Sequence, residues 1–446
     1  MDAAELHALL TPEGLRLLDA TDPVASSADV ARTVSTLRAA GHSPDLVSAV
    51  VGQARLRVKA RAKFGDFADR MLFTRAGLEQ ATRLSVAAHH AGRFRAAGIE
   101  RVADLGCGIG GDALAMAGLG IRVDAVEADE VTAALAAYNL APFGADARVH
   151  HATAQEFVTA TLPNAARRMH NAGVHALPTG DDAVEPRECA PDRDEPDADS
   201  CVAHRPDVPT AVWFDPARRT AGHSETRRTA PEDWSPSLDW VFDLISRVPG
   251  GVKLGPGLDR DLIPDDIEAQ WVSADGSTVE LVLWSGVLAR PGIRRAALVL
   301  RGSRAWELTA PADAPDAAVR PLGAYIHEPD GAVIRARLIG EVARSLHAGM
   351  LSEGIAYLTS DDARTSPFAA SFRVRETLPA DTKKLARALR ERGIGTLEIK
   401  KRGVDVDPAA LRQALKLRGD DSATLILTRI DGARTAILAD RLPPAS

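Results

Sequence analysis

The sequence has little cysteine, few aromatic residues and no excess of positive charge. Only three of its 446 residues are cysteines (Cys107, Cys189 and Cys201), and no two of them form a C-x-x-C pair. Three cysteines cannot build the disulfide framework of a secreted domain, so a reducing compartment fits best. With 54 Lys and Arg against 61 Asp and Glu, the net charge is −7. The chain therefore has no global field that attracts a polyanion, and any such site must be local.

Long apolar runs are absent as well. No stretch of about 18 consecutive apolar residues occurs, which excludes an ordinary membrane-spanning helix. The first five residues include Asp2 and Glu5, where a signal peptide requires positive charge. We therefore expect a cytoplasmic protein with no membrane contact. The chain is 45% hydrophobic, which is enough for two or three packed domains.

The hydrophobic pattern changes twice along the first two thirds of the chain. Residues 1–72 show apolar positions spaced by three and four, which predicts a helical region. Residues 73–305 alternate short apolar runs with helical spacing, which predicts an open, doubly wound α/β sheet of Rossmann type. The expected strands are Val102–Asp104, Val123–Glu127, Ala147–His151, Ala211–Phe214, Gly251–Leu254, Val279–Trp284 and Ala296–Leu300.

The remaining segments are an insertion and two small modules. Within residues 163–209, the stretch 181–199 has nine acidic residues against two arginines, which predicts a disordered acidic insertion without a metal site. Residues 306–370 read as a linker followed by a strand–helix–strand module, expected at Leu322–Ile326, Gly331–Leu346 and Ile355–Leu358. Residues 371–446 predict a final α+β module with helices at Thr382–Arg392 and Pro408–Leu415 and strands at Thr396–Ile399, Thr424–Arg429 and Arg434–Ala439.

A glycine-rich sequence follows the first predicted strand. Asp104-Leu-Gly106-Cys-Gly108-Ile-Gly110-Gly-Asp opens a helix, and Glu127 closes the next strand. Glycines allow the backbone to turn sharply and to approach a ligand closely. The same residues also satisfy the dinucleotide pattern G-x-G-x-x-G, which is weak evidence by itself.

Asp104, two residues before the first glycine, distinguishes a dinucleotide site from a site for a different ligand. Asp104 would repel a pyrophosphate, but it suits the ammonium group of S-adenosylmethionine, which carries no phosphate. Glu127 would then accept hydrogen bonds from the ribose hydroxyls. The pattern D-x-G-x-G-x-G therefore predicts a class I methyltransferase with no metal requirement. A nicotinamide enzyme and a glycine turn without a ligand are the alternatives.

A candidate catalytic loop follows the strand Ala211–Phe214. Asp215-Pro216-Ala217-Arg218 stands where amino-directed methyltransferases carry an N/D-P-P-aromatic motif. An exocyclic amine becomes a good nucleophile when oxygen acceptors orient its hydrogens, and Asp215 with the Pro216 carbonyl can do this. Arg218 replaces the aromatic residue, and its guanidinium can stack on a base or bind phosphate. An acid that merely begins a turn is the alternative.

The segment Leu72-Phe-Thr74-Arg-Ala-Gly-Leu-Glu-Gln80-Ala-Thr82-Arg resembles the one that precedes the glycine loop in bacterial THUMP-like-domain class I methyltransferases. Trimethylguanosine synthases have a comparable segment. The resemblance implies that Thr74, Gln80 and Thr82 help to hold the methionine end of the cofactor; otherwise Gln80 and Thr82 are polar positions on an amphipathic helix. Many methyltransferases bind the adenine amine through an Asp after the third strand, where this chain offers Thr153 or Gln155.

The last module concentrates positive charge. Residues 373–418 contain thirteen Lys and Arg against six acids. A local basic surface is typical of contact with a phosphate backbone, although a plain solvated face is the alternative. The run Gly393–Asp405 resembles the THUMP-like module, and Tyr325–Ala336 resembles the ferredoxin-like piece beside it in that family. THUMP domains in RNA-modifying enzymes bind tRNA, so the candidate RNA-binding residues are Lys383, Lys384, Arg387, Lys400, Lys401 and Arg402.

These patterns together predict a methyltransferase that uses S-adenosylmethionine and acts on RNA, specifically on a guanine amine of tRNA. Two other hypotheses stay open at this point. One is a methyltransferase of a protein or small molecule, and the other is a protein that binds the cofactor or RNA without turnover.

Overall fold

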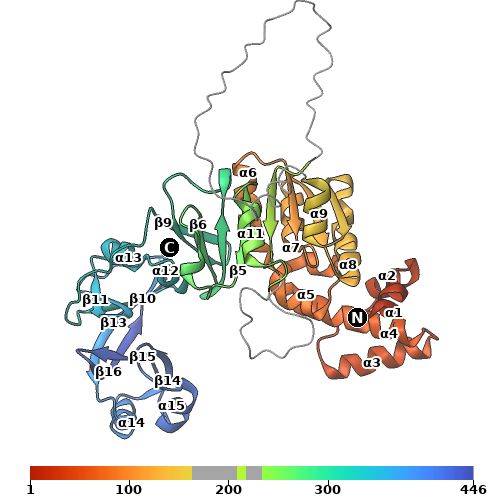
Figure 1. Cartoon of the computed structure of the whole chain (residues 1–446). Helices are drawn as coiled ribbons and strands as arrows, with labels where there is room; N and C mark the ends of the chain where they lie inside the picture. The colour runs from red at the N-terminus through yellow and green to blue at the C-terminus, as the bar shows by residue number, and fades with distance from the viewer. Residues whose placement is uncertain (163–207, 217–233, 445–446) are drawn as a thin grey trace, which may run out of the picture. The chain divides into compact units, whose positions relative to one another are not determined.

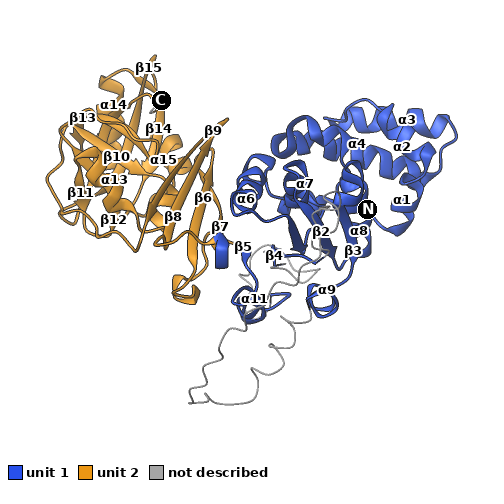
Figure 2. Ribbon diagram, turned by 90° about the horizontal axis from the view of Figure 1, so that it is seen from above, with its two compact units in different colours: residues 1–252, 285–288 blue, residues 253–284, 289–446 orange. Residues whose placement is uncertain are grey.

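The computed structural model describes residues 1–162, 208–216 and 234–444 (Figure 1). Most of the expected acidic insertion, and with it Cys189 and Cys201, lies outside these residues, as does Arg218. The chain forms two compact units (Figure 2). Unit 1 comprises Met1–Val252 and Ser285–Leu288, and unit 2 comprises Lys253–Trp284 and Ala289–Ser446. The domain limits expected from the sequence stay predictions.

Unit 1 begins with helices, as the spacing of apolar residues predicts. They are α1 (Ala3–Leu9), α2 (Pro12–Asp19), α3 (Ser27–Ala39) and α4 (Pro44–Phe64). Each begins at a side-chain cap, supplied in turn by Asp2, Thr11, Ser26 and Ser43, which accepts a hydrogen bond from an otherwise unpaired N–H. Their buried faces share one apolar core around Leu9, Leu18 and Val50. A short helix η1 (Gly65–Arg70), α5 (Arg75–Gln80) and α6 (Leu84–Ala96) lead to the sheet.

The strands of unit 1 are parallel and follow the order β3-β2-β1-β4-β5. They are β1 (Arg101–Leu105), β2 (Arg122–Glu127), β3 (Ala147–His151), β4 (Ala211–Phe214) and β5 (Gly250–Leu254). The connecting helices are α7 (Gly111–Gly118), α8 (Glu130–Leu140) with η2 (Ala141–Asp146), α9 (Ala154–Thr161) and α11 (Leu238–Ile245). Strand order reverses between β1 and β4, and ligands of open α/β sheets bind at the carboxyl ends of such strands.

Unit 2 contains two groups of strands. The first has the order β7-β6-β8-β9, built from β6 (Glu268–Ala274), β7 (Ser277–Trp284), β8 (Arg295–Arg301) and β9 (Arg304–Ala310). The short helix η4 (Arg260–Leu262) lies before β6 in the chain, and η5 (Gly286–Leu288), which follows β7, belongs to unit 1.

The second group is a seven-stranded sheet with the order β11-β12-β10-β13-β16-β15-β14. Its elements are β10 (Tyr325–Pro329), α12 (Gly331–Arg335), α13 (Ile339–Leu346), β11 (Gly349–Ser352), β12 (Ile355–Ser360), β13 (Ala369–Leu378), α14 (Thr382–Glu391), β14 (Ile394–Lys401), α15 (Pro408–Leu415), β15 (Asp421–Ile430) and β16 (Ala433–Arg441). One apolar core joins α14 and α15 to this sheet, and a second core contains Tyr357 and Phe372. The two C-terminal modules expected from the sequence therefore share one sheet.

All seven strands expected between Val102 and Leu300 are present, with ends shifted by at most two residues. Strands β6 and β9 were not expected. All seven residues of β6 are buried although three of them are polar: Glu268, Gln270 and Ser273. The expected strand Leu322–Ile326 was placed too early, since β10 begins at Tyr325.

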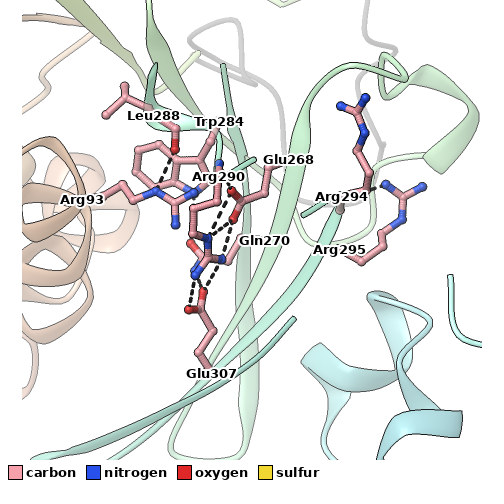
Figure 3. A network of polar contacts seen from close by, with 9 residues as sticks. All are labelled: Arg93, Glu268, Gln270, Trp284, Leu288, Arg290, Arg294, Arg295 and Glu307. Atoms are coloured by element: carbon pink, nitrogen blue, oxygen red, sulfur yellow. Dashed lines mark hydrogen bonds and ion pairs between the residues drawn. The ribbon is translucent and has the colours of Figure 1, made fainter. Parts of the chain in front are cut away.

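Glu268 and Gln270 of β6 find partners inside unit 2, as Figure 3 shows. Arg290 donates to the Glu268 carboxylate at 2.6 Å and to Glu307 Oε1 at 2.8 Å, while Trp284 Nε1 donates to Gln270 Oε1 at 3.0 Å. Burial by itself lowers the pKa of the Arg290 guanidinium, but the hydrogen bonds to Glu307 and Glu268 outweigh burial. The pKa of Arg290 is therefore raised overall. The network lets a strand with alternating polar residues lie in a buried sheet.

Candidate cofactor site

The glycine loop, residues 106–111, connects β1 to α7. Gly106, Gly108 and Gly110 adopt φ values of 91°, 55° and 85°, a region that residues with a Cβ rarely enter. The backbone N–H groups of Gly106 and Cys107 donate to the carbonyl of Val126 at 2.9 and 3.0 Å. A Cβ at Gly108 would have no atom within 4 Å. The loop therefore presents bare backbone to open space beside the end of β2.

Glu127, the last residue of β2, is fixed by this loop. Its Oε2 accepts from Gly108 N at 3.0 Å, and its Oε1 accepts from Asp129 N at 2.9 Å. A carboxylate has about four lone-pair positions, so two acceptor positions remain for further donors. The partly buried Glu127 is thus oriented by its own backbone surroundings before any ligand arrives.

Asp104 lies on β1 two residues before Gly106, and it is 1% exposed. Burial raises the pKa of the neighbouring Cys107 thiol, and the carboxylates of Asp104 and Glu127 raise it further. Cys107 is therefore a neutral thiol at physiological pH and not a nucleophile. The two acids concentrate negative charge where the glycine loop begins.

The segment of residues 71–82 packs beside the glycine loop. A Cβ at Gly77, in α5, would lie 2.6 Å from the Cγ2 atom of Ile109, so only glycine allows this approach. Thr74 caps α5 by accepting from Gly77 N at 2.9 Å. Gln80 is exposed at the end of α5. Thr82 is buried and donates to Asp112 Oδ2 at 2.7 Å, in the first turn of α7.

The loop after β4 also lies against the glycine loop. A Cβ at Gly106 would be 3.1 Å from the carbonyl oxygen of Asp215, which follows directly from the pairing of β1 with β4. Asp215 is partly buried and Pro216 is buried. Thr153 lies elsewhere, at the start of α9, where its hydroxyl accepts from Glu156 N at 3.2 Å.

The candidate RNA-binding residues divide into two groups. Lys383, Lys384 and Arg387 are exposed on α14, and Lys401 is exposed on β14. Lys400 instead forms an ion pair with Glu328 of β10 at 2.5 Å, and Arg402 lies 3.8 Å from the same carboxylate. The guanidinium of Arg402 also lies over the buried Tyr357 ring, 5.6 Å from its centroid.

The sequence analysis missed Gln53 and Asn139, whose side chains are buried at 0% and 4% exposure. Both hydrogen-bond to backbone groups of residues 71–82 or of the glycine loop. On α8 the available signal was a single amide among buried Ala and Leu residues, whereas on α4 Gln53 shares its buried face with Arg57. No group of three or more metal-ligating side chains occurs among residues 1–162, 208–216 and 234–444. In the same part of the chain, no helix is long and apolar enough to cross a membrane.

Two regions match known families. Residues 369–441 match the family described as THUMP domain-like, and residues 2–60 match a domain of unknown function (DUF8688). Most of the chain is similar to an uncharacterized S-adenosylmethionine-dependent methyltransferase of Mycobacterium tuberculosis, in strains CDC 1551 / Oshkosh and H37Rv. The identity is 32% over 383 residues, which cover 84% of this chain and 90% of each relative.

A solved structure has the same fold. A protein of Porphyromonas gingivalis W83, determined as a candidate methyltransferase, superimposes with a TM-score of 0.64 at 19% identity and covers 94% of this chain and 99% of that one. The parallel sheet, its glycine loop and the acid at the end of β2 define a Rossmann-like class I methyltransferase. The chain belongs to the THUMP-like class I S-adenosylmethionine-dependent methyltransferases. The predicted fold, family, enzyme class and cofactor are thereby confirmed.

Proposed function

We propose that this methyltransferase acts on RNA, and that its acceptor is an exocyclic guanine amine of tRNA. The observation that carries the proposal is the exposed basic face of α14, within the region that matches the THUMP domain-like family. Lys383, Lys384, Arg387 and Arg390 are all exposed on this one helix, in a chain whose net charge is −7. A concentrated basic surface on an acidic protein favours a local polyanion contact.

The cofactor fits the glycine loop and its two acids. Asp104 supplies negative charge for an ammonium group, and Glu127 retains acceptor positions for a ribose diol. The open space over Gly108 gives room for a ligand to approach the backbone. When bound, S-adenosylmethionine supplies the methyl group, and the protein supplies binding, orientation and exclusion of water. Thr74, Gln80, Thr82, Gly106, Gly110 and Thr153 complete the proposed cofactor-binding set.

Asp215 and Pro216 are the proposed catalytic groups, together with Arg218. The Asp215 carboxylate and the Pro216 carbonyl accept the two hydrogens of the acceptor amine and direct its lone pair outward. Proline restricts the backbone of the loop, so these acceptors are oriented before the substrate binds. The contact between Asp215 O and Gly106 supports this role, because it brings the loop to the edge of the cofactor site.

A methyl-transfer assay tests the proposal directly. Total RNA from a strain that lacks the protein is incubated with the enzyme and tritiated S-adenosylmethionine, and the labelled nucleoside is then identified. We expect label in tRNA as a methylated guanosine amine. A parallel incubation uses a cell lysate of the same strain, and label in its protein or small-molecule fraction, with none in RNA, would establish the other acceptor class.

A further inference from the structure

Two buried amide side chains hold an extended piece of chain beside the glycine loop. Gln53, on α4, donates to the carbonyl of Phe73 at 2.7 Å and accepts from Phe73 N at 3.0 Å. Asn139, near the end of α8, makes the same pair of hydrogen bonds with Leu72. It accepts from the Leu72 N–H at 2.7 Å and donates to the Leu72 carbonyl at 3.0 Å. The two side chains thus replace the neighbouring strands that an extended backbone otherwise needs.

Asn139 makes one contact that Gln53 does not make. Its amide nitrogen also donates to the carbonyl of Ile109, within the glycine loop, at 2.9 Å. Both N–H groups of Asn139 are therefore used, one on each of two chain segments. Leu140, the next residue, supports the same loop, because a Cβ at Gly110 would be 3.3 Å from its Cγ atom.

We propose that Asn139 is a positioning residue for S-adenosylmethionine, which fixes the glycine loop against residues 71–74. The proposal rests on the cofactor of the family and not on the RNA substrate. Ile109 contacts Gly77 of α5 on one side and accepts from Asn139 on the other, so a single planar amide sets the spacing of both segments. A site with its spacing already set loses less ordering entropy when the ligand binds.

The small contribution of the Asn139 hydrogen bonds to folding distinguishes a positioning role from a role in overall stability. A neutral hydrogen bond contributes about 1 kcal/mol to folding, which is a small part of the stability of a domain. A carboxylate at this position would repel the carbonyls of Leu72 and Ile109, so the two segments that carry them would no longer be held together. We therefore expect a change at Asn139 to affect cofactor affinity more than its effect on unfolding suggests.

Asn139→Asp is the sharpest variant, since it keeps the shape and the acceptor for Leu72 N–H. It replaces both donors with an oxygen that faces the carbonyls of Leu72 and Ile109. We expect the Kd for S-adenosylhomocysteine, measured by calorimetry on the full chain, to rise about tenfold or more. Amide hydrogen exchange of residues 106–111 in the free enzyme should become faster.

Leu37→Ala is the matched control. Leu37 is buried in the core of the N-terminal helices and belongs to neither segment, so its truncation lowers stability without touching Asn139. An unchanged Kd in folded Asn139→Asp, or an equal rise in Leu37→Ala, overturns the proposal. If Asn139→Asp does not fold, Asn139→Ser, which keeps one donor, takes its place. Failure of both variants to fold assigns Asn139 to global stability and also overturns the proposal.

Discussion

Glu127 illustrates how a single side chain is prepared for its ligand. Gly108 N and Asp129 N hold its carboxylate, and the proposed ribose hydroxyls complete its hydrogen bonds. We predict that Glu127→Ala weakens cofactor binding by about 2 to 4 kcal/mol, the loss of two charge-assisted hydrogen bonds. Calorimetry with S-adenosylhomocysteine measures this loss, and Glu130→Ala, an exposed acid in the first turn of α8, is the control. Equal affinities of wild type and Glu127→Ala would contradict the assignment.

The residues of the site differ in how far the sequence reveals them. Asp104, the glycines and Glu127 are recognisable because their roles depend on neighbours within one βαβ unit. Asn139 hydrogen-bonds to Leu72, 67 positions away, and Gln53 to Phe73, 20 positions away. Their partners are backbone groups, which leave no pattern in the sequence. Pairs of this kind become visible only when the fold brings the segments together.

His327 is buried on β10, an interior strand of the seven-stranded sheet, between the hydroxyls of Ser371 and Ser360 at 2.8 and 2.9 Å. Burial lowers its pKa from 6.5 to about 4. Between pH 6.5 and 4, His327 is protonated in the unfolded chain but not in the folded chain. The free energy of unfolding therefore falls as the pH drops from 6.5 towards 4. The full effect is about 3 kcal/mol.

Urea unfolding at pH 7.5 and pH 5 checks this prediction. We expect wild type to lose about 2 kcal/mol more than His327→Gln over this interval, because glutamine does not titrate. Other titrating groups contribute equally to both proteins and cancel in the difference. A pH dependence that is the same in both proteins would contradict the prediction.

At the scale of elements, β6 shows why some strands escape prediction. Periodic patterns assume that buried positions are apolar, but Glu268 and Gln270 are buried and satisfied by Arg290, Glu307 and Trp284. In the final module, by contrast, the two helices and the last three strands were predicted, and only β13 was not expected. Helix α14 buries Leu385, Ala386 and Leu389 and has five charged residues among its other positions, so its pattern is unambiguous.

The network around β6 gives a stability prediction. Arg290→Met removes the guanidinium that Glu268 pairs with, while the carboxylate of Glu268 remains at 0% exposure. We expect a loss of about 3 kcal/mol in the free energy of unfolding, because one partner of a buried ion pair is removed. The double variant Glu268→Gln/Arg290→Met should recover much of this loss. Urea unfolding that finds the double variant less stable than the single one would contradict the argument.

Helix α14 gives the corresponding prediction for RNA. Lys383, Lys384 and Arg387 changed together to Ala should weaken tRNA binding equally for all sequences, and the helix should persist because Ala favours it and the Asp381 cap remains. The slope of log affinity against log salt should fall by about 0.7 to 0.9 for each lost phosphate contact.

The matched control removes three exposed charges elsewhere, as Arg16, Arg32 and Arg38 to Ala, on α2 and α3. It should leave the salt slope unchanged. An equal effect of the two triple variants would indicate a general field, and no effect of either would make α14 a solvated face. Lys400 and Arg402 are omitted, since Glu328 already neutralises part of their charge.

At the scale of the whole molecule, the proposed RNA-binding residues and the proposed catalytic residues lie in different parts of the chain. The proposed catalytic and cofactor-binding residues of the described chain lie in unit 1, whereas the basic residues of α14 lie in unit 2. An enzyme of this design can lose RNA affinity without losing cofactor affinity, and it can lose turnover without losing either. Variants in the two units should therefore have separable effects on KM for RNA and on kcat.

Asp215 tests chemistry apart from binding. Asp215→Ala should leave the affinities for S-adenosylhomocysteine and tRNA nearly intact, because the glycine loop and α14 hold these ligands. It should lower the rate of methyl transfer by roughly a hundredfold or more, the effect of losing one positioned polar group. Asp215→Asn keeps an oxygen acceptor and should retain more activity than Asp215→Ala. Single-turnover transfer from tritiated S-adenosylmethionine measures both variants, and a fully active Asp215→Ala enzyme would place the acceptor amine against other groups of the site.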